Sequence, residues 1–419
     1  MKVFKFGGAS VKDAESVRNI GKILSNYSNE KLVIVVSAMG KMTNAFEWLI
    51  NSYCYSPNKL KHSLNEIVDF HNKILWDLFP DKSHKVYSEI NDFLFQLEEE
   101  LEVSYANKYT KNFDKTYDSL AGYGELMSTT IISNYLNNSG ILSTWIDVRT
   151  LIKTNSDYRE AKVDWDASKM KINELKEESI IVTQGFIGSD SDNKMTTLGR
   201  EGSDFSAAIL GYCLDAESVT IWKDVAGVLN ADPKYYPEAT KIDKMSYREA
   251  LELSYYGATV IHPKTIKPLE NKEIPLYVKS FLNHEGEGTV VQKLTTFDAL
   301  LPSYIFIEDQ ILVSISTKDF SFIAEDNMSF IFGALSKAKL KVNLIQNSAL
   351  SLSLCFKNDE KKVAQFFDSI KDSFLARYNE NVTLLTIRHY SEDVIDNMTK
   401  DKQIYLEQKT RNTARFILK

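Results

Sequence analysis

Short apolar runs alternate with amphipathic segments over residues 1–280, and this alternation is the strongest constraint on the fold. Residues 3–6 predict a strand, and residues 13–24 predict a helix with one apolar face. The run at 32–36 is Leu-Val-Ile-Val-Val, which is typical of a strand covered on both faces. Further runs of this type lie at 179–186 and 218–222. Strand-helix-strand alternation favours an α/β domain with a largely parallel sheet.

Two other regions have different patterns. Residues 57–115 are rich in Lys, Glu, Asn and Leu at helical spacing, which predicts a helical insertion. A polar, glycine-containing stretch at 283–288 is the best candidate for a domain boundary, so we expect one domain over 1–283 and a second over 284–419. In the second domain the expected order is strand, helix, strand, strand, helix, strand. This ferredoxin-like order says little about function.

Composition excludes several classes of protein. The net charge of −7 argues against a nucleic-acid-binding surface built on positive charge. The three cysteines lie far apart without a CxxC pair, which is typical of a reducing compartment and predicts neither a disulfide framework nor a zinc site. No apolar run approaches the roughly 20 residues of a membrane-spanning helix, and the N-terminus lacks a signal-peptide core. We therefore expect a cytoplasmic protein without membrane or nucleic-acid partners, and assign no metal site.

The loop after the first predicted strand is suited to anions. Lys5 supplies a positive charge, and Gly7 and Gly8 allow backbone amides to approach an anion at the start of the next helix. The alternative is a turn in which the two glycines only satisfy backbone geometry. The sequence contains no G-x-x-x-x-G-K-[ST] and no G-x-G-x-x-G after a strand, so P-loop and dinucleotide-binding folds lack their fingerprints.

Two later loops carry further candidates. Ser37 and Thr43 follow a buried strand, at the sheet edge where ligands of open α/β sheets bind, although an ordinary polar loop explains them equally simply. Arg200 can make a bidentate pair with a carboxylate, and Ser203 and Asp204 open the following helix. The alternatives are a helix-capping role for Ser203 or Asp204 and a surface position for Arg200.

Acidic and basic residues elsewhere have two interpretations. Lys223, Asp224 and Lys234 belong to a stretch after another strand, which could surround a nucleotide or form a solvated loop. Glu125 lies in the first turn of a predicted helix, where the helix dipole favours acids, so a structural role is the default. The functional alternative is that Glu125 binds a substrate ammonium group.

In series, these motifs closely resemble the aspartate kinases of the amino-acid kinase fold, and the resemblance covers nearly the whole chain. The matching motifs are KFGG-x-S, SAMGKMTN, GYGELMS, TQGFIG, TTLGREGSD, WKDVAGVLNADP and YGATVIHP. The resemblance implies an α/β amino-acid kinase fold, with a largely parallel sheet between helices, followed by an α+β regulatory region of ACT type. It also implies phosphoryl transfer from Mg-ATP to the side-chain carboxylate of L-aspartate, the first step of lysine, threonine and methionine biosynthesis.

Matching positions imply roles for individual residues. The implied catalytic set is Lys5, Asp204 and Arg200, with Lys5 neutralising charge and Asp204 organising the lysines. The implied substrate-binding residues are Ser37, Thr43, Glu125, Phe186, Arg200 and Ser203, with Glu125 taking the α-ammonium. The implied nucleotide-binding residues are Lys5, Phe6, Gly7, Gly8, Lys223, Asp224, Leu229, Lys234 and Thr259.

Some positions depart from the family pattern. Ala9 replaces a hydroxyl residue, which is tolerable if its backbone amide is what binds. Glu201 adds a carboxylate near an anion site, and we expect it to point away. Leu229 replaces a tyrosine beside the nucleotide, and Thr259 replaces a phosphate-binding lysine whose role Lys223 could take.

The C-terminal part resembles ACT domains, which commonly bind an end-product amino acid at a dimer interface. We expect a homodimer, one full ACT unit over about 309–388, and a reduced second unit from residue 392 onward completed by residues 298–308. Asn343 and Ala349 stand where lysine-sensing members carry an aspartate and a glutamate. Because a buried lysine ammonium without a carboxylate is costly, we hypothesise that lysine binds this site weakly or that another amino acid is the effector.

Two other functions compete with aspartate phosphorylation. A sister kinase would act on glutamate, carbamate or a nucleotide, but GYGELMS, WKDVAGVLNADP and the ACT pair favour aspartate. A non-catalytic amino-acid sensor is favoured by Leu229 and Thr259 and disfavoured by Lys5, Arg200 and Asp204. At 419 residues, we expect no fused homoserine dehydrogenase.

Overall fold

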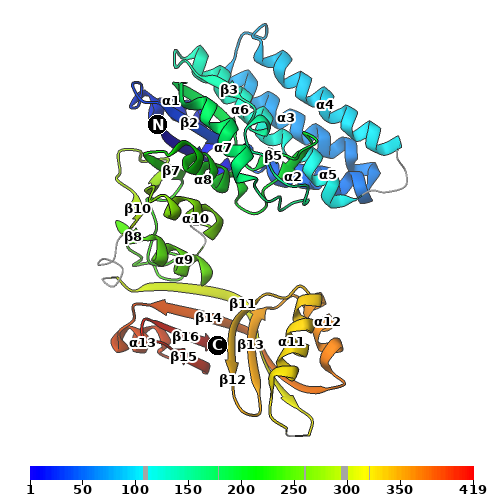
Figure 1. Ribbon diagram of the computed structural model, residues 1–419, viewed down its shortest axis with the longest axis vertical. Helices are drawn as coiled ribbons and strands as arrows, with labels where there is room; N and C mark the ends of the chain where they lie inside the picture. Colours follow the sequence, from blue (N-terminus) through cyan, green and yellow to red (C-terminus); the bar gives the residue numbers. More distant parts are fainter. Residues whose placement is uncertain (107–111, 178, 259–260, 294–300, 320) are drawn as a thin grey trace. The chain divides into compact units, whose positions relative to one another are not determined.

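The computed structural model describes residues 1–106, 112–177, 179–258, 261–293, 301–319 and 321–419. These residues form two compact units. The first comprises Met1–Val228, Asp243–Leu251 and Val260–Thr295, and the second comprises Leu229–Ile242, Glu252–Thr259 and Thr296–Lys419. Each unit has its own main sheet (Figure 1). The domain limits drawn from the sequence stay a prediction.

Within its described residues, the first unit contains an eight-stranded sheet in the order β3-β4-β2-β1-β7-β9-β10-β8. The strands are β1 Lys2–Phe6, β2 Leu32–Val36, β3 Thr144–Ile146, β4 Ile180–Gln184, β7 Ser218–Lys223, β8 Lys244–Ser246, β9 Leu276–Ser280 and β10 Thr289–Gln292. All neighbouring pairs are parallel except β9 with β10. Every residue of β2 and β4 is buried, as expected of parallel strands covered by helices on both faces. The predicted largely parallel α/β fold is confirmed.

The described helices of the first unit pack on this sheet or on one another (Figure 1). They are α1 Ala14–Ser25, α2 Met42–Tyr55, α3 Leu60–Leu78, α4 Val86–Ala106, α5 Phe113–Leu120, α6 Tyr123–Asn138, α7 Trp165–Asn173, α8 Gly202–Leu214, α9 Tyr247–Tyr255 (shared with the second unit) and α10 Pro263–Asn271. A small hairpin, β5 Ile187–Ser189 with β6 Met195–Thr197, lies outside the sheet. α6 and α8 are both buried on nearly every face, so both lie in the interior of this unit. None of the described helices combines enough length with enough apolar character to span a bilayer.

Within its described residues, the second unit contains a six-stranded antiparallel sheet in the order β12-β13-β11-β14-β16-β15. The strands are β11 Ser303–Thr317, β12 Val342–Asn347, β13 Leu352–Lys357, β14 Phe374–Arg388, β15 Ile404–Lys409 and β16 Thr413–Leu418. The helices are α11 Glu325–Lys337, α12 Glu360–Ile370 and α13 Glu392–Thr399. The order from β11 to β14 confirms the predicted ferredoxin-like arrangement.

The two central strands of this sheet are unusually long. β11 and β14 have 15 residues each and pair from Ser303 with Arg388 to Thr317 with Phe374. β13 pairs with β11 over residues 310–315, and β16 pairs with β14 over residues 383–388. The register shifts between Ile307 and Leu312, so a bulge separates the segments of β11 that serve the two ends of the sheet.

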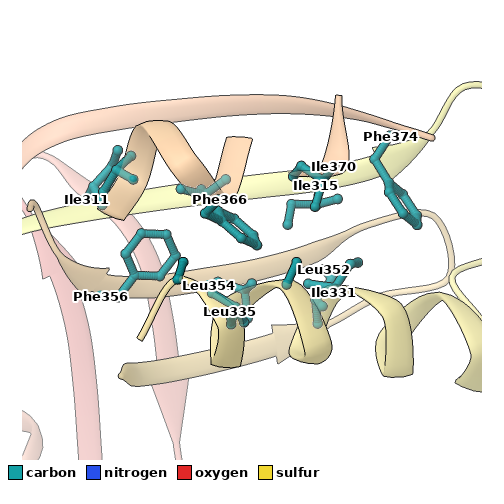
Figure 2. Packing of buried hydrophobic residues seen from close by; sticks show 14 of the residues in the cluster. Ile311, Ile315, Ile331, Leu335, Leu352, Leu354, Phe356, Phe366, Ile370 and Phe374 are labelled. Carbon is teal, nitrogen blue, oxygen red and sulfur yellow. The ribbon is translucent and has the colours of Figure 1, made fainter. Parts of the chain in front are cut away.

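An apolar core lies between the sheet and helices α11 and α12 (Figure 2). Phe366 from α12 is fully buried, and its ring lies 5.8 Å from that of Phe356 in an edge-to-face arrangement. Replacing Phe366 by alanine should lower the free energy of unfolding by about 3–5 kcal/mol, because it removes buried apolar surface and leaves a cavity. Chemical denaturation followed by circular dichroism would measure the loss.

Phe322 provides a matched control for this prediction, because its side chain is 70% exposed. Phe322→Ala should change the free energy of unfolding by less than about 0.5 kcal/mol. Equal losses for the two substitutions would contradict the packing described above.

Candidate active site

A cavity of about 840 Å³ lies at the carboxyl ends of β1, β2 and β7, where ligands of open α/β sheets bind. The predicted site residues that line it are Lys5, Gly8, Ser37, Thr43, Glu125, Phe186, Arg200, Ser203, Asp204 and Lys223. They come from loops that are far apart in sequence. The parallel sheet brings them together because its strands end at one edge.

Two lysines and one aspartate form the charged centre of the cavity. Lys5 is the second-to-last residue of β1 and its side chain is buried. Its Nζ lies 2.6 Å from Oδ1 of Asp204 in the first turn of α8. Lys223 Nζ lies 3.5 Å from the other oxygen, Oδ2. Burial alone would raise the pKa of Asp204, but the two ammonium groups outweigh it and hold that pKa below its ordinary value. The ionised carboxylate therefore holds two cations side by side. The three groups together keep one positive charge, which can attract an anion.

The loops after β1 and β2 approach each other very closely. A Cβ atom on Gly8 would lie only 2.6 Å from the carbonyl oxygen of Gly40, so a larger residue at position 8 would push the two loops apart. The Gly40 N–H donates to the Gly8 carbonyl at 3.0 Å and ties the loops together. The glycines therefore serve loop geometry as well as any ligand.

Glu125 presents an incompletely bonded carboxyl group in the first turn of α6. Its side chain is buried, and Oε1 accepts a hydrogen bond from the Ala38 N–H at 3.1 Å. Oε2 is also buried and has no hydrogen-bond partner among the described residues. Burial raises the pKa of Glu125 to about 8, against smaller opposing effects of the Ala38 N–H and Lys5. Such a group is suited to bind an ammonium ion, which would supply the missing donor and favour the ionised form.

Backbone strain is concentrated around this cavity. Among its described lining residues, Arg159, Phe186 and Glu201 adopt left-handed φ values of 67°, 71° and 53°. Each costs on the order of 1–2 kcal/mol for a residue with a side chain. Hydrogen bonds hold two of them: Arg159 N–H donates to buried Asp118 at 3.0 Å, and Phe186 N–H donates to Ser206 Oγ at 2.9 Å. Strained residues of this kind cluster at functional sites.

The sequence did not reveal the rim formed by Arg159, Tyr117 and Asp114. The Arg159 guanidinium lies 4.5 Å from the centroid of the Tyr117 ring, and its Nη1 lies 3.3 Å from Asp114 Oδ1. None of these residues belongs to a glycine-rich motif, so no local signal marked them. Glu201, which we expected to point away, is among the residues that line the cavity.

Several predicted nucleotide-binding residues do not line this cavity. The ring of Phe6 is fully buried and stacks on Trp222 at 6.1 Å, so its side chain belongs to the core. Gly7 and Asp224 neighbour lining residues but are not among them. Leu229 and Lys234 belong to the second unit, and Thr259 lies outside the described residues. Nucleotide contacts by these residues stay a prediction.

Comparison with known proteins agrees with this fold. The model of the amino acid kinase family matches residues 1–280. The chain is also 31% identical to lysine-sensitive aspartokinase 3 of Escherichia coli over 361 residues, which cover 84% of this chain and 77% of that protein. The chain belongs to the aspartokinases of the amino acid kinase family. The resemblance seen in the sequence motifs is thereby confirmed.

Solved aspartokinases have the same fold along the whole chain. Escherichia coli aspartokinase III in complex with lysine and aspartate superposes with a TM-score of 0.84 at 26% identity, covering 100% of this chain and 95% of that one. The same enzyme in complex with aspartate and ADP gives a TM-score of 0.82 at 26% identity, covering 100% and 96%.

Other aspartokinase relatives are longer. A chloroplastic bifunctional aspartokinase/homoserine dehydrogenase 2 of Arabidopsis thaliana is 31% identical over 387 residues, which cover 89% of this chain but 42% of that protein. This aspartokinase therefore spans less than half the length of that bifunctional relative.

Proposed function

We propose that this aspartokinase transfers the γ-phosphoryl group of ATP to the side-chain carboxylate of L-aspartate and forms 4-phospho-L-aspartate. The observation that carries the proposal is the joint presence, in one cavity, of the Lys5–Asp204–Lys223 centre and the buried carboxyl group of Glu125. The charged centre can bind two reacting anions, and the Glu125 carboxyl group can bind an α-ammonium group. Escherichia coli aspartokinase III has been solved with aspartate and ADP, which supports the same ligands here.

The charged centre would act on the transferred group. An oxygen of the aspartate side chain forms a bond to the γ-phosphorus while the bond from that phosphorus to the leaving oxygen of ADP breaks. Lys5 and Lys223 offset the repulsion between carboxylate and phosphate, and neutralise charge on the phosphoryl oxygens as they move. Asp204 keeps both ammonium groups in place, so little reorganisation is needed during the reaction.

The proposal includes Mg²⁺ that enters with ATP. Across the described ranges, no group of three or more His, Cys, Asp or Glu side chains is arranged to hold a metal ion. In the proposal the ion is held mainly by phosphate oxygens, the usual arrangement for Mg²⁺ with nucleotides, where it would supply additional positive charge.

Glu125 and Arg200 would orient the amino acid. Glu125 Oε2 would accept from the α-ammonium, for which it has no competing donor among the described residues. Arg200 is exposed and has no hydrogen-bond or ion-pair partner in the described part of the chain, so its guanidinium is available for the α-carboxylate. These contacts at the two α-substituents would leave the side chain facing the lysines.

Trapping the acyl phosphate tests the proposal directly. The protein would be incubated with Mg-ATP, L-aspartate and hydroxylamine, with L-glutamate as the control acceptor. We expect aspartate hydroxamate in proportion to the ADP released, and little product with glutamate. A folded protein that binds ATP but yields no hydroxamate would instead support the amino-acid sensor.

We also propose that the second unit is an ACT-type regulatory region of a homodimer in which lysine binds weakly. Asn343 Nδ2 donates to Oε1 of the buried Gln310 at 2.7 Å, and Ala349 is exposed. Neither offers a carboxylate to a lysine ammonium. Half-inhibition by lysine should therefore need more than about 1 mM, measured as the dependence of hydroxamate formation on lysine concentration. Inhibition at low micromolar lysine that Asn343→Ala abolishes would contradict this.

A further inference from the structure

Two helices of the first unit face each other with mainly polar side chains, at positions where a buried helix usually presents apolar ones. Helices α4 and α6 pack together. The facing residues recur at i, i+3, i+4 and i+7 on each helix: Glu89, Asp92, Phe93 and Gln96 on α4, and Thr130, Ser133, Asn134 and Asn137 on α6. At this spacing a buried helix normally presents apolar side chains to its neighbour. The facing residues instead border a cavity of about 420 Å³, which we name the α4–α6 cleft. It shares no lining residue with the candidate active site.

Asn134 leaves a hydrogen bond unmade at this cleft. Its side chain is 6% exposed, and its Nδ2 donates to Glu89 Oε2 at 2.7 Å and to the Thr130 carbonyl at 2.9 Å. These two bonds fix the orientation of the amide group. Its Oδ1 is then buried without a hydrogen-bond partner among the described residues. A buried acceptor of this kind is destabilising unless an N–H or O–H donor reaches it.

The charges around the cleft favour a cation. Lys85 pairs with Glu89 at 3.1 Å, whereas Asp92 has no ion pair among the described residues, so these three side chains sum to one negative charge. Phe93 and Trp145 add aromatic walls, with ring centroids 6.5 Å apart. Aromatic faces attract cations as well. Lys85 already pairs with Glu89, so a further positively charged group with N–H donors would be needed to reach Asp92 and Asn134 Oδ1.

We propose that the α4–α6 cleft is a second ligand site for a small molecule that carries an aliphatic ammonium group and is the size of an amino acid or a diamine. Its N–H groups donate to Asn134 Oδ1 and to the carboxylates of Glu89 and Asp92, and its aliphatic part lies against Phe93 and Trp145. The proposal does not depend on the reaction proposed for the other cavity.

Calorimetric titration of the full chain with 1,4-diaminobutane and with L-ornithine tests this site. The two probes share the aliphatic ammonium and differ by one carboxylate. We expect saturable binding of at least one probe, weakened about tenfold in Asp92→Asn because a charge-assisted hydrogen bond is lost. Asp92 is exposed, so this substitution should leave folding intact. The matched control is Glu98→Gln, which removes an exposed carboxylate of α4 outside the cleft and should leave the affinity unchanged.

Each outcome of the titration has a defined meaning. Binding of the diamine alone would identify an amine ligand without a carboxylate, and binding of ornithine alone would identify an amino acid whose carboxylate reaches Lys85. The absence of binding by either probe up to about 10 mM would overturn the proposal. So would ornithine binding that Asp92→Asn leaves unchanged, because that ligand would then occupy another part of the chain.

Discussion

Replacing Lys5 by methionine is expected to lower kcat for hydroxamate formation by about three orders of magnitude. The Lys5 ammonium is buried beside Asp204, so no solvent cation would replace it when charge moves between the two substrates. The substitution also leaves the buried Asp204 with Lys223 alone. We therefore expect the free energy of unfolding to fall by about 3 kcal/mol, and circular dichroism must confirm that the variant is folded at the assay temperature.

A second lysine of the same strand provides the control. Lys2 forms an ion pair with Glu30 near the surface, so Lys2→Met removes an equal charge from β1 away from the cavity. It should keep kcat within about twofold of the unmodified protein. If Lys5→Met retained more than about a tenth of the activity, the role of Lys5 in phosphoryl transfer would be wrong.

Glu125 is expected to control the pH dependence of aspartate use. The α-ammonium pairs with the ionised form, whereas the pKa of about 8 keeps most of the free enzyme in the neutral form at pH 7. kcat/KM for aspartate should therefore rise about tenfold per pH unit well below pH 8 and level off above it, because this parameter reports the free enzyme. Initial rates between pH 6 and pH 9 would show the profile. A flat profile would contradict the assignment.

Glu125→Gln separates charge from shape at this position. The amide oxygen can still accept from the Ala38 N–H, but the negative charge is lost. KM for aspartate should rise about 100-fold and lose its pH dependence, while KM for ATP stays within about twofold. A parallel increase in both KM values would indicate general damage to the cavity instead.

The same carboxyl group should make the folded state less stable as pH rises, although aspartate use increases over the same pH range. The pKa of Glu125 in the folded protein is about 8, above its ordinary value of 4.5, so the folded state holds the proton more tightly than the unfolded state. The stabilisation is complete below pH 4.5 and is lost as pH rises through about 8. Without ligand, Glu125→Gln should therefore gain stability relative to the unmodified protein as pH is raised from 6 to 9.

The site residues that can be predicted from the sequence are those at the carboxyl ends of the parallel strands. Lys5 and Lys223 lie in the last two residues of β1 and β7, Ser37 directly follows β2, and parallel strands end at one edge of the sheet. Their common location in one cavity could therefore be expected before any coordinates were known. The same logic predicts the fold, because continuous β-branched runs have few alternatives to a strand buried on both faces.

The hydrogen bonds, burial and backbone strain of the site residues could not be predicted in this way. The hydrogen bond that Glu125 accepts from Ala38 spans 87 residues of sequence, and its unpaired Oε2 depends on how α6 packs. The strained backbone at Arg159 is held by Asp118, 41 residues away, and no motif links the two. Such properties arise from tertiary contacts, which leave no periodic signal in the sequence.

The long strands of the second unit make that unit indivisible. β11 and β14 run through the whole of one sheet, which has β12 and β13 in one half and β15 and β16 in the other. A chain break within either strand would therefore damage both halves. Limited proteolysis should therefore yield no stable fragment that corresponds to one half. Evolution faces the same restriction: neither half can be lost, exchanged or duplicated by a simple recombination event, because the other half would lose its own central strands.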